Sequence, residues 1–280
     1  MPTDQLHITL IQPDIVWESK DSNLRHYESL IDNIDGRREI VVLPEMFSTG
    51  FSMEPERLAE PMDGPSVNWM KDMAAKHRCI LTGSLIIEEG GQYFNRLIWM
   101  QPNGQFGIYD KRHLFGYARE DEHYAPGRKR LLVSVNGWRI SPLICYDLRF
   151  PVWSRNVQPP TMHTADTSSQ TSSAESPNTP YDVLLYVANW PERRSLAWKT
   201  LLQARAIENQ AFVVGVNRVG TDGKNISYSG DSAVYGPLGE IIWQQSGEAA
   251  VQTVVLDKNH LIQTRSDFPF LKDADQFILL

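Results

Sequence analysis

The stretch LLVSVNGWRISPLIC, residues 131–145, decides how the rest of the sequence is interpreted. It contains two β-rich runs, residues 131–135 and 138–144, separated by Asn136-Gly137. Asn-Gly between such runs is a strong signal for a two-residue hairpin, because both residues tolerate the positive φ angles that the turn requires. We therefore predict an antiparallel pair here. Two further hairpins are predicted, one between residues 96–100 and 106–109 and one around residues 237–239.

Helix–strand units flank the predicted hairpins. The apolar run EIVVL at residues 39–43 is typical of a strand that is buried on both faces. Apolar residues spaced three and four apart predict helices that begin near Asp21 or Ser22, at Ser66 and at residue 196. Since such units alternate with hairpins, we expect an α/β fold of two stacked mixed sheets with helices outside. The other predicted strands are residues 7–12, 79–87, 183–188, 212–216 and 251–256.

The composition excludes several classes of protein. The 280 residues carry 27 Lys and Arg against 34 Asp and Glu, a net charge of −7 without a long basic run, so we expect no nucleic-acid partner. The apolar runs are too short to span a bilayer, and the N-terminal MPTDQLHITLIQPD lacks the basic start of a signal peptide. We expect no membrane segment, a cytoplasmic location and reduced thiols at Cys79 and Cys145.

Residues 158–180, QPPTMHTADTSSQTSSAESPNTP, differ from the rest of the chain. Ser, Thr, Pro and Ala dominate the segment, and Met162 is its only large apolar side chain, so it cannot contribute a core. We interpret it as a long loop inserted into a single domain that covers residues 1–280. A linker between two domains is the weaker alternative, because the flanking ICYD and LLYVANW both look like strands of one core.

Three chemically suitable side chains follow predicted strands. Cys145 ends one strand at a strand-to-helix corner, where backbone N–H groups lower a thiol pKa and can bind an oxyanion. Glu45 follows the run EIVVLP and could serve as a general base, and Lys111 follows residues 106–109 and could stabilise an oxyanion. The alternatives are an inert buried cysteine, as we expect for Cys79, and ordinary solvated charges. Strand ends meet at one edge of a sheet, so the three could converge.

The segments LPEMF, YDKRHLF and ICYDLRFP, taken together, resemble the nitrilase superfamily of C–N hydrolases. The likeness continues through YVANWP, QARAIENQ, VVGVNRVG and GDSAVYGPLGEII and so covers nearly the whole chain. It implies a four-layer α-β-β-α sandwich and a Glu-Lys-Cys catalytic triad. In that reading Glu45 takes the thiol proton, Cys145 is acylated, and Lys111 and the N–H of Tyr146 hold the oxyanion.

The resemblance also implies further site residues. Many members carry a second glutamate, for which GYAREDEHYAPG offers Glu120 or Glu122, and we favour Glu120. DKRHLF, CYDLRFPVWSRN and LYVANWPERRSLAW look most similar to the omega-amidase branch, which deaminates omega-amides such as alpha-ketoglutaramate. The distal carboxylate of such a substrate needs a cation, either Arg193 or Arg194, and we favour Arg194. The expected apolar walls of the pocket are Phe47, Phe115, Tyr146 and Trp190.

The same resemblance sets the expected partners. The substrate is a small amide, no metal or organic cofactor is needed, and the family's members lead us to expect a homodimer or higher homo-oligomer. The 158–180 segment departs from close relatives, which have a short connection there, and this puts the usual dimer geometry in doubt. Other chemistries on the same fold stay open, namely a nitrilase, a carbamoylase, an acyltransferase or a non-catalytic binding protein.

Overall fold

The computed structural model describes residues 3–156, 180–275 and 277, and within them the strands form two sheets. In the first sheet β1 and β2 are parallel, as are β2 and β3, whereas β4 and β5 follow β3 as an antiparallel meander. The strands of this sheet, in spatial order, are β13 (Ala250–Asp257), β1 (Gln5–Gln12), β2 (Ile40–Val42), β3 (Ile80–Glu89), β4 (Gln92–Met100) and β5 (Phe106–Asp110).

The second sheet is also mixed. Its centre is the parallel trio β7, β8 and β9, and antiparallel strands extend it on both sides. Both sheets therefore combine parallel and antiparallel pairs, as the alternation of hairpins and helix–strand units predicts. The strands, in spatial order, are β10 (Val219–Thr221), β11 (Ser227–Tyr235), β9 (Phe212–Val216), β8 (Val183–Val187), β7 (Trp138–Ile144) and β6 (Val133–Val135), and β12 (Ile241–Ser246) pairs with β11.

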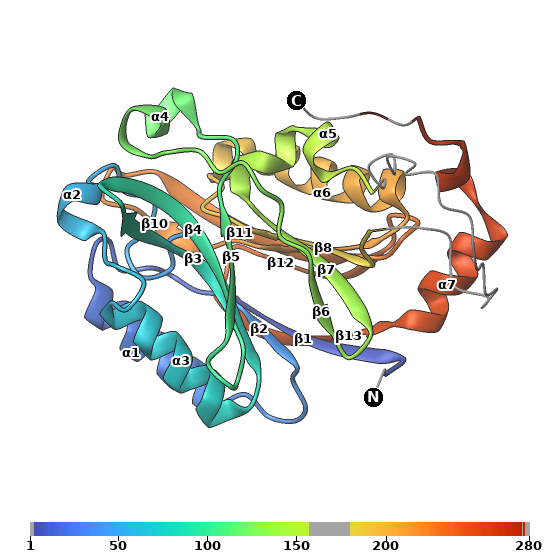
Figure 1. The fold of residues 1–280 in the computed structure, drawn as a ribbon, viewed down its shortest axis with the longest axis horizontal. Helices are drawn as coiled ribbons and strands as arrows, with labels where there is room; N and C mark the ends of the chain where they lie inside the picture. The colour runs from blue at the N-terminus through green and yellow to red at the C-terminus, as the bar shows by residue number, and fades with distance from the viewer. Residues whose placement is uncertain (1–2, 157–179, 276, 278–280) are drawn as a thin grey trace, which may run out of the picture.

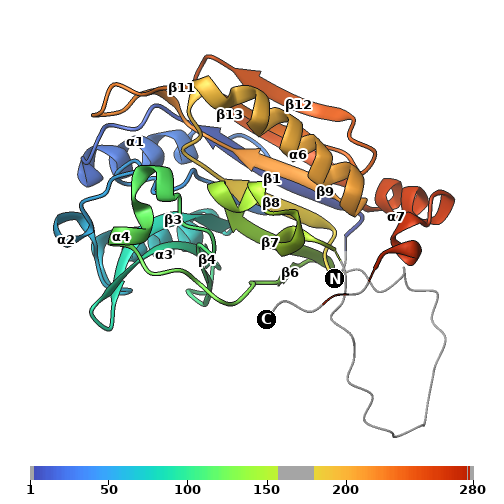
Figure 2. The same ribbon diagram turned by 90° about the horizontal axis from the view of Figure 1, so that it is seen from above.

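Helices cover the outer faces of the stacked sheets, which gives four layers (Figures 1 and 2). Helices α1 (Lys20–Asp32) and α3 (Pro65–His77) lie on the first sheet, and α6 (Ser195–Asn209) lies on the second. This is the α-β-β-α sandwich that the resemblance implies. The remaining helices are α2 (Pro55–Leu58), α4 (Glu120–His123), α5 (Pro151–Ser154) and α7 (Lys258–Asp267).

Alternation along the strands builds two cores. In β2, Ile40 and Val42 join the cluster between the sheets, which also contains Trp138 of the second sheet. Val41 and Leu43 point the other way, into the cluster under α1 and α3. All four side chains are buried, which confirms the prediction that EIVVL is covered on both faces. Each buried aliphatic side chain contributes about 1.5–3 kcal/mol of hydrophobic stabilisation.

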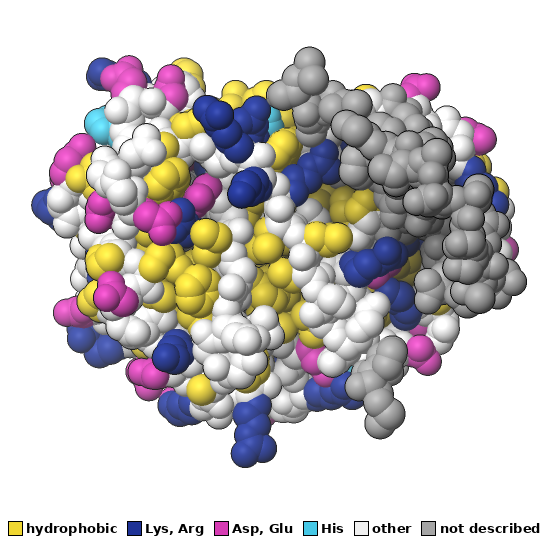
Figure 3. Space-filling view, in the orientation of Figure 1, with side chains coloured by type: hydrophobic (Ala, Val, Ile, Leu, Met, Phe, Trp, Pro, Cys, Tyr) yellow, Lys and Arg dark blue, Asp and Glu magenta, His cyan; other side chains and the backbone are white. Residues whose placement is uncertain are grey.

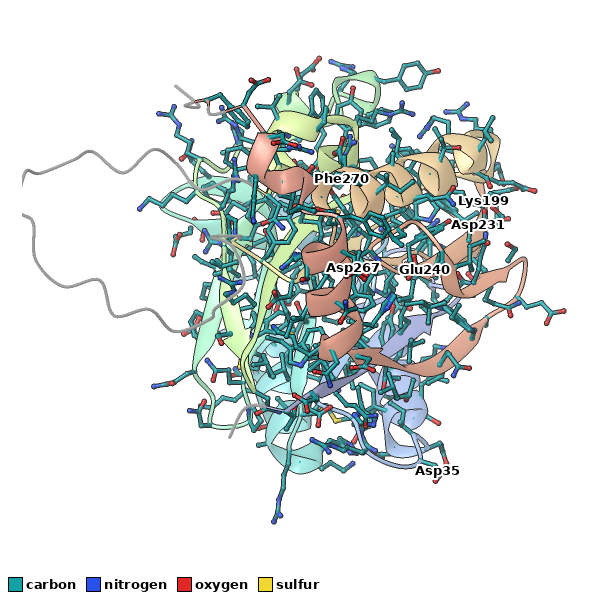
Figure 4. All side chains as sticks on the ribbon, turned by 90° about the vertical axis from the view of Figure 1, so that its right-hand side faces the viewer. Asp35, Lys199, Asp231, Glu240, Asp267 and Phe270 are labelled. Atoms are coloured by element: carbon teal, nitrogen blue, oxygen red, sulfur yellow. The ribbon has the colours of Figure 1, made fainter. Side chains whose placement is uncertain are left out.

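Polar contacts hold α6 on the second sheet. Figure 4 shows Lys199 of α6 beside Asp231 of β11, whose carboxylate lies 3.5 Å from the Lys199 ammonium. The same α6 donates the Trp198 indole N–H to the carbonyl of Asp231, 2.8 Å away. Asp231 also accepts the hydroxyls of Ser229 and Ser246 at 2.5 and 2.6 Å, so one buried carboxylate ties α6 to both β11 and β12.

The predicted hairpin turns are confirmed, whereas the predicted helix caps are not observed. Val135 pairs with Trp138 across Asn136-Gly137, and β4 and β5 pair as expected. Ser66 lies inside α3, whose N-terminal N–H groups at Ser66 and Val67 are instead accepted by the distant Glu60 carboxylate.

The predicted start of the first helix is also slightly displaced. The N-cap position of α1 is Ser19, so Asp21 and Ser22 lie within the first turn rather than before it. Of the predicted insertion at 158–180, only residue 180 falls among the described residues.

Candidate active site

A pocket of about 210 Å³ opens where the ends of strands from both sheets meet. In the parallel trio of the second sheet, Cys145 follows β7 and Asn189 lies beyond the end of β8. In the first sheet, Glu45 follows β2, and Lys111 follows β5, which runs in the same direction as β2. The carboxyl ends of strands are where α/β proteins commonly place their sites. The lining includes Lys111, Phe115, Cys145, Tyr146, Trp190 and Arg194.

Sharp turns present the side chains at these strand ends. Cys145 begins a short 3₁₀ turn, Cys145–Arg149, and its backbone φ is +42°. Met46, the residue after Glu45, also has a φ of +42°. Residues other than glycine adopt this left-handed conformation only when the surrounding structure holds them there, and such positions cluster at functional sites. The turns explain how a thiol and a carboxylate on different sheets face one location.

Lys111 joins two buried carboxylates. Its ammonium lies 2.8 Å from Glu45 Oε1 and 3.0 and 2.9 Å from the two oxygens of Glu120. All three side chains are fully buried. Burial alone would lower the pKa of Lys111, but the charges of Glu120 and Glu45 outweigh it and raise the pKa of Lys111. The ammonium is therefore a fixed positive charge in the site.

Glu120, and not Glu122, belongs to this cluster. The Glu120 carboxylate also accepts the backbone N–H of Phe115 at 2.6 Å. Burial raises the pKa of Glu120, and the Lys111 ammonium opposes that shift. Glu122 is exposed and pairs with Arg119 instead. The alternative that we favoured from the sequence is thus the residue that lies beside Lys111.

The environment of Cys145 differs from the expectation of a lowered thiol pKa. The residue is 9% exposed, and burial, followed by the negative charge of Glu45, raises the pKa of the Cys145 thiol well above its usual range. Lys111 opposes this shift but does not reverse it. The expectation is therefore wrong for the free protein, because burial and the charge of Glu45 outweigh the effect of the Lys111 ammonium. The thiol is neutral and hydrogen-bonds to Glu45.

Two asparagines complete the surroundings of Glu45, and sequence reasoning missed both. The backbone N–H of Asn189 donates to Glu45 Oε2 at 2.8 Å, and its side-chain amide donates to the Glu45 carbonyl. The side-chain amide of Asn95 donates to Glu45 Oε1 at 2.8 Å. Asn189 lies beyond a strand at the predicted edge, which is a signal that the sequence offers. Asn95 lies between Phe94 and Arg96 in β4 and is fully buried, so its amide needs hydrogen-bond partners inside the protein.

Three arginines lie around the mouth of the pocket, and their guanidinium groups stack on aromatic rings. Arg149 lies over Trp190, Arg193 over Tyr117 and Arg194 over Phe115, at 5.0, 5.8 and 5.0 Å from the ring centroids. Within the described residues none of the three forms an ion pair.

Electrostatics distinguishes Arg194 from Arg193. Burial and the neighbouring Arg193 lower the pKa of Arg194, whereas Arg193 is exposed. Figure 3 shows Lys and Arg side chains gathered between α4 and α5, the two short helices beside this region.

Three of the four expected apolar walls line the pocket. Phe115 and Tyr146 contact each other edge to face, with ring centroids 4.9 Å apart, and Trp190 donates its indole N–H to the Arg194 carbonyl at 2.8 Å. Phe47 does not line the pocket. It is fully buried between Tyr27 and Trp69 in the core under α1 and α3, because the sharp turn at Met46 directs its side chain away from the pocket.

In residues 3–156, 180–275 and 277, no group of three or more His, Cys, Asp or Glu side chains is arranged to hold a metal ion. Over the same residues, no helix has both the length and the apolar character needed to cross a membrane.

Comparisons with known proteins agree with this geometry. The family model for carbon-nitrogen hydrolases matches residues 7–266. The chain is 44% identical over 275 residues to the omega-amidase YafV of Escherichia coli (strain K12), covering 98% of each chain. It is 29% identical over 269 residues to the 2-oxoglutaramate amidase of Bacillus subtilis, covering 95% and 96%. A CN-hydrolase superfamily protein of Xanthomonas campestris, solved with an arsenic adduct in its active site, has a TM-score of 0.90 at 41% identity, covering 99% and 100%.

Proposed function

The chain belongs to the carbon–nitrogen hydrolase family and is a hydrolase of carbon–nitrogen bonds, and we propose that its substrate is the omega-amide of a dicarboxylic acid, such as alpha-ketoglutaramate. The products are the acid and ammonia, and a thioester on Cys145 is the intermediate. The observation that carries the proposal is the cluster of Glu45, Lys111 and Cys145 at a pocket whose mouth holds Arg194.

The first step forms the thioester. The neutral thiol of Cys145 already hydrogen-bonds to Glu45, so the carboxylate takes the proton as the sulfur attacks the amide carbon. The negative charge that develops on the carbonyl oxygen is held by the Lys111 ammonium and by the backbone N–H of Tyr146. Glu45 then passes the proton to the departing nitrogen, the C–N bond breaks and ammonia leaves.

The second step returns the enzyme to its starting state. Glu45 accepts a proton from a water molecule, whose oxygen attacks the thioester carbon. The C–S bond breaks, the acid is released, and the proton on Glu45 returns to the sulfur. Glu120 does not line the pocket, so its role is to hold Lys111 in place through two hydrogen bonds.

The arginine-lined part of the pocket suits a carboxylate. Arg194 lines the pocket, is half-buried and has no ion-pair partner within the part of the chain that the structure describes. A desolvated guanidinium without a partner favours an anionic ligand, and a carboxylate can bind it through two parallel hydrogen bonds. Phe115, Tyr146 and Trp190 supply the apolar walls around the carbon chain of such a substrate.

We also propose that the protein forms a homodimer or higher homo-oligomer in a reducing, cytoplasmic environment. Two large apolar side chains of α6, Leu196 and Ile207, are 78% and 52% exposed, and a second subunit packed on this helix would bury them. The free thiols Cys79 and Cys145 suit a reducing compartment. Sedimentation velocity of the purified protein measures the number of subunits.

Ammonia release measured over a panel of amides tests the proposed reaction. We expect omega-amides that carry a distal carboxylate to be hydrolysed with the highest kcat/KM, above neutral monoamides and nitriles. The variants Cys145→Ala and Cys145→Ser should lose at least a thousandfold in kcat, because no other group can form the thioester. Unchanged thermal unfolding curves serve as the folding control, and ammonia release that survives in both variants contradicts the mechanism.

The same panel tests the carboxylate site. The variant Arg194→Ala should raise KM for omega-amides about 10- to 100-fold, since loss of one charge-assisted hydrogen-bonding group costs about 1.5–3 kcal/mol. Neutral amides of equal length should change less than threefold. Arg193→Ala is the matched control, because Arg193 is adjacent in sequence but exposed. An equal effect of Arg194→Ala on charged and neutral amides rejects this role.

A further inference from the structure

We propose that Asn95 is a positioning residue for amide hydrolysis, which fixes the Glu45 carboxylate so that one of its oxygens faces the Cys145 thiol. The inference rests on the general-base role proposed for Glu45. Asn95 lies in β4, is fully buried and does not line the pocket, so it acts through Glu45 rather than on the substrate.

The hydrogen bonds of Asn95 reach every charged member of the buried cluster. Its side-chain nitrogen donates to Glu45 Oε1 at 2.8 Å and to Glu120 Oε1 at 3.2 Å. Its backbone carbonyl accepts the N–H of Lys111 at 3.0 Å. One residue therefore sets the positions of both carboxylates and of the backbone that carries the ammonium.

The hydrogen bonds on Glu45 explain why this matters for the reaction. A carboxylate offers about four lone-pair positions, two on each oxygen. On Oε1 they receive the Lys111 ammonium and the Asn95 amide, and on Oε2 one receives the backbone N–H of Asn189. The remaining lone pair of Oε2 is the one available to the Cys145 thiol. Loss of the Asn95 bond would leave Oε1 held by Lys111 alone and would allow the carboxylate to rotate away from the sulfur.

A second buried side chain locks the Asn95 amide in this orientation. The Ser84 hydroxyl accepts the backbone N–H of Met46 at 2.8 Å and donates to Asn95 Oδ1 at 2.8 Å. The amide nitrogen therefore faces the carboxylates and the amide oxygen faces Ser84, because ionised carboxylates have no proton to donate to an amide oxygen in the reversed orientation. The chain of bonds begins at Met46 and ends on Glu45, so it holds both the strained turn and the carboxylate that the turn presents.

The charge balance explains why an amide suits this position. Glu45 and Glu120 carry two negative charges against the single positive charge of Lys111, and Asn95 adds hydrogen-bond donors without adding charge. An apolar side chain would leave a buried lone pair on each carboxylate without a partner, which is costly. A third carboxylate would add a further buried negative charge, which is costly unless it binds a proton.

Two variants of Asn95 test the proposal by different physical effects. Asn95→Leu keeps most of the volume and removes the hydrogen bonds, so kcat for the omega-amide should fall about 100-fold while KM stays within threefold.

The activity of the variant Asn95→Asp should depend on pH. A protonated carboxyl at this position can still accept a hydrogen bond from Ser84 and donate one to Glu45, whereas an ionised carboxylate repels Glu45. Its activity relative to the unchanged protein should be at least tenfold higher at pH 5.5 than at pH 8.5.

The controls separate positioning from a general loss of structure. Asn103→Asp makes the same chemical change in the exposed turn between β4 and β5 and should leave kcat, KM and the pH profile unchanged. If Asn95→Leu does not fold, Ser84→Ala replaces it, with an expected three- to tenfold fall in kcat at unchanged KM.

The outcomes also separate this inference from the proposed function. A protein that hydrolyses no amide overturns the proposed function. An active protein whose Asn95→Asp variant keeps kcat within threefold at both pH values, or changes only in KM, overturns the positioning role of Asn95.

Discussion

At the scale of single residues, the surroundings of Cys145 keep its thiol neutral. Cys145 is almost fully buried beside two carboxylates and one ammonium, and this environment raises its pKa through burial and through the charge of Glu45. Glu45 is within hydrogen-bonding reach of the thiol. In the proposed mechanism, the sulfur becomes a nucleophile only as it attacks, when the proton moves to the carboxylate. A neutral thiol reacts more slowly with oxidants than a thiolate does.

Ultraviolet absorbance at 240 nm, where thiolates absorb, tests the neutral state of Cys145. Between pH 6 and pH 9 the difference spectrum between the unchanged protein and Cys145→Ser should show no thiolate contribution. The reason is that the pKa of the thiol is raised, so the proton stays bound throughout this range. A titration with its midpoint below pH 8 contradicts the prediction. Cys79→Ser is the control, since Cys79 lies in the core under α1 and α3.

Sequence reasoning located residues whose chemistry depends on strand ends and missed those that depend on side-chain direction. Glu45, Lys111 and Cys145 each follow a strand, and the topology alone brings strand ends to one edge. The resemblance placed Phe47 in the pocket wall, but the sharp turn at Met46 directs it into the core. Asn95 was missed because the pairing that brings β4 under Glu45 cannot be derived from β4 alone.

At the scale of elements, one buried carboxylate joins the second sheet to the C-terminal helix. Asp182, just before β8, accepts the backbone N–H of Arg139 in β7 at 2.9 Å. It also binds the Lys258 ammonium at 2.6 Å and the Arg265 guanidinium at 3.2 Å, which lie at the two ends of α7. The elements that present Cys145 and Asn189 are thereby held to a helix distant from the pocket.

The variant Asp182→Asn should lower the free energy of unfolding by about 3 kcal/mol at pH 7, because it removes the negative charge that faces the buried Arg265 guanidinium and the partly buried Lys258 ammonium. Burial alone would raise the pKa of Asp182, but the hydrogen bond and charge of Lys258 and the N–H of Arg139 lower it overall. A lowered pKa in the folded protein means that the stabilisation is present above the unfolded pKa of about 3.9 and is lost as the pH falls below it.

Urea unfolding at several pH values measures this effect. The difference between the unchanged protein and Asp182→Asn should be constant from pH 8 to pH 5 and should shrink below about pH 4. Asp267→Asn is the matched control, because Asp267 is an exposed carboxylate at the end of α7, as Figure 4 shows. A difference that grows as the pH falls contradicts the assignment.

Secondary-structure elements could be predicted where residues within the element itself determine its conformation. The hairpin at Asn136-Gly137 forms as expected, because the two turn residues alone specify it; both have positive φ angles, +50° and +84°. The N-terminus of α3 was not predictable, because its cap is Glu60, which lies outside the helix and reaches back to it. Serine is a common helix cap, but the Ser66 hydroxyl donates a hydrogen bond to the Glu60 carboxylate instead.

At the scale of the whole molecule, the site exists only because two sheets stack. Glu45 and Lys111 come from the first sheet, and Cys145 and Asn189 come from the second. Both the 2.8 Å contact from the Asn189 N–H to Glu45 and the contact between Glu45 and the Cys145 thiol cross from one sheet to the other. We therefore expect activity to depend on how the two sheets pack against each other, because the cluster between them includes Cys145 and Trp190, which line the pocket.

Because the residues on both sides of segment 158–179 pack into one unit, we predict that this segment can be replaced without loss of activity. The residues that border it are held together, since Asn156 donates its amide to the Tyr181 carbonyl at 3.1 Å and accepts the Tyr181 N–H at 3.2 Å. Asn156 is further fixed to α6 by Asn209, whose side-chain oxygen accepts its N–H at 2.8 Å. The chain therefore departs and returns at adjacent points of one packed unit.

A linker of about six Gly and Ser residues in place of 158–179 should leave kcat and KM within twofold of the unchanged protein. The free energy of unfolding should rise by about 1 kcal/mol, because closing a shorter loop costs less chain entropy. Ammonia release and urea unfolding measure the two effects, and a Gly/Ser linker of the original length is the control for loop length. A variant that fails to fold would favour two linked domains over one domain with an insertion, because a short linker would then prevent the two halves from packing.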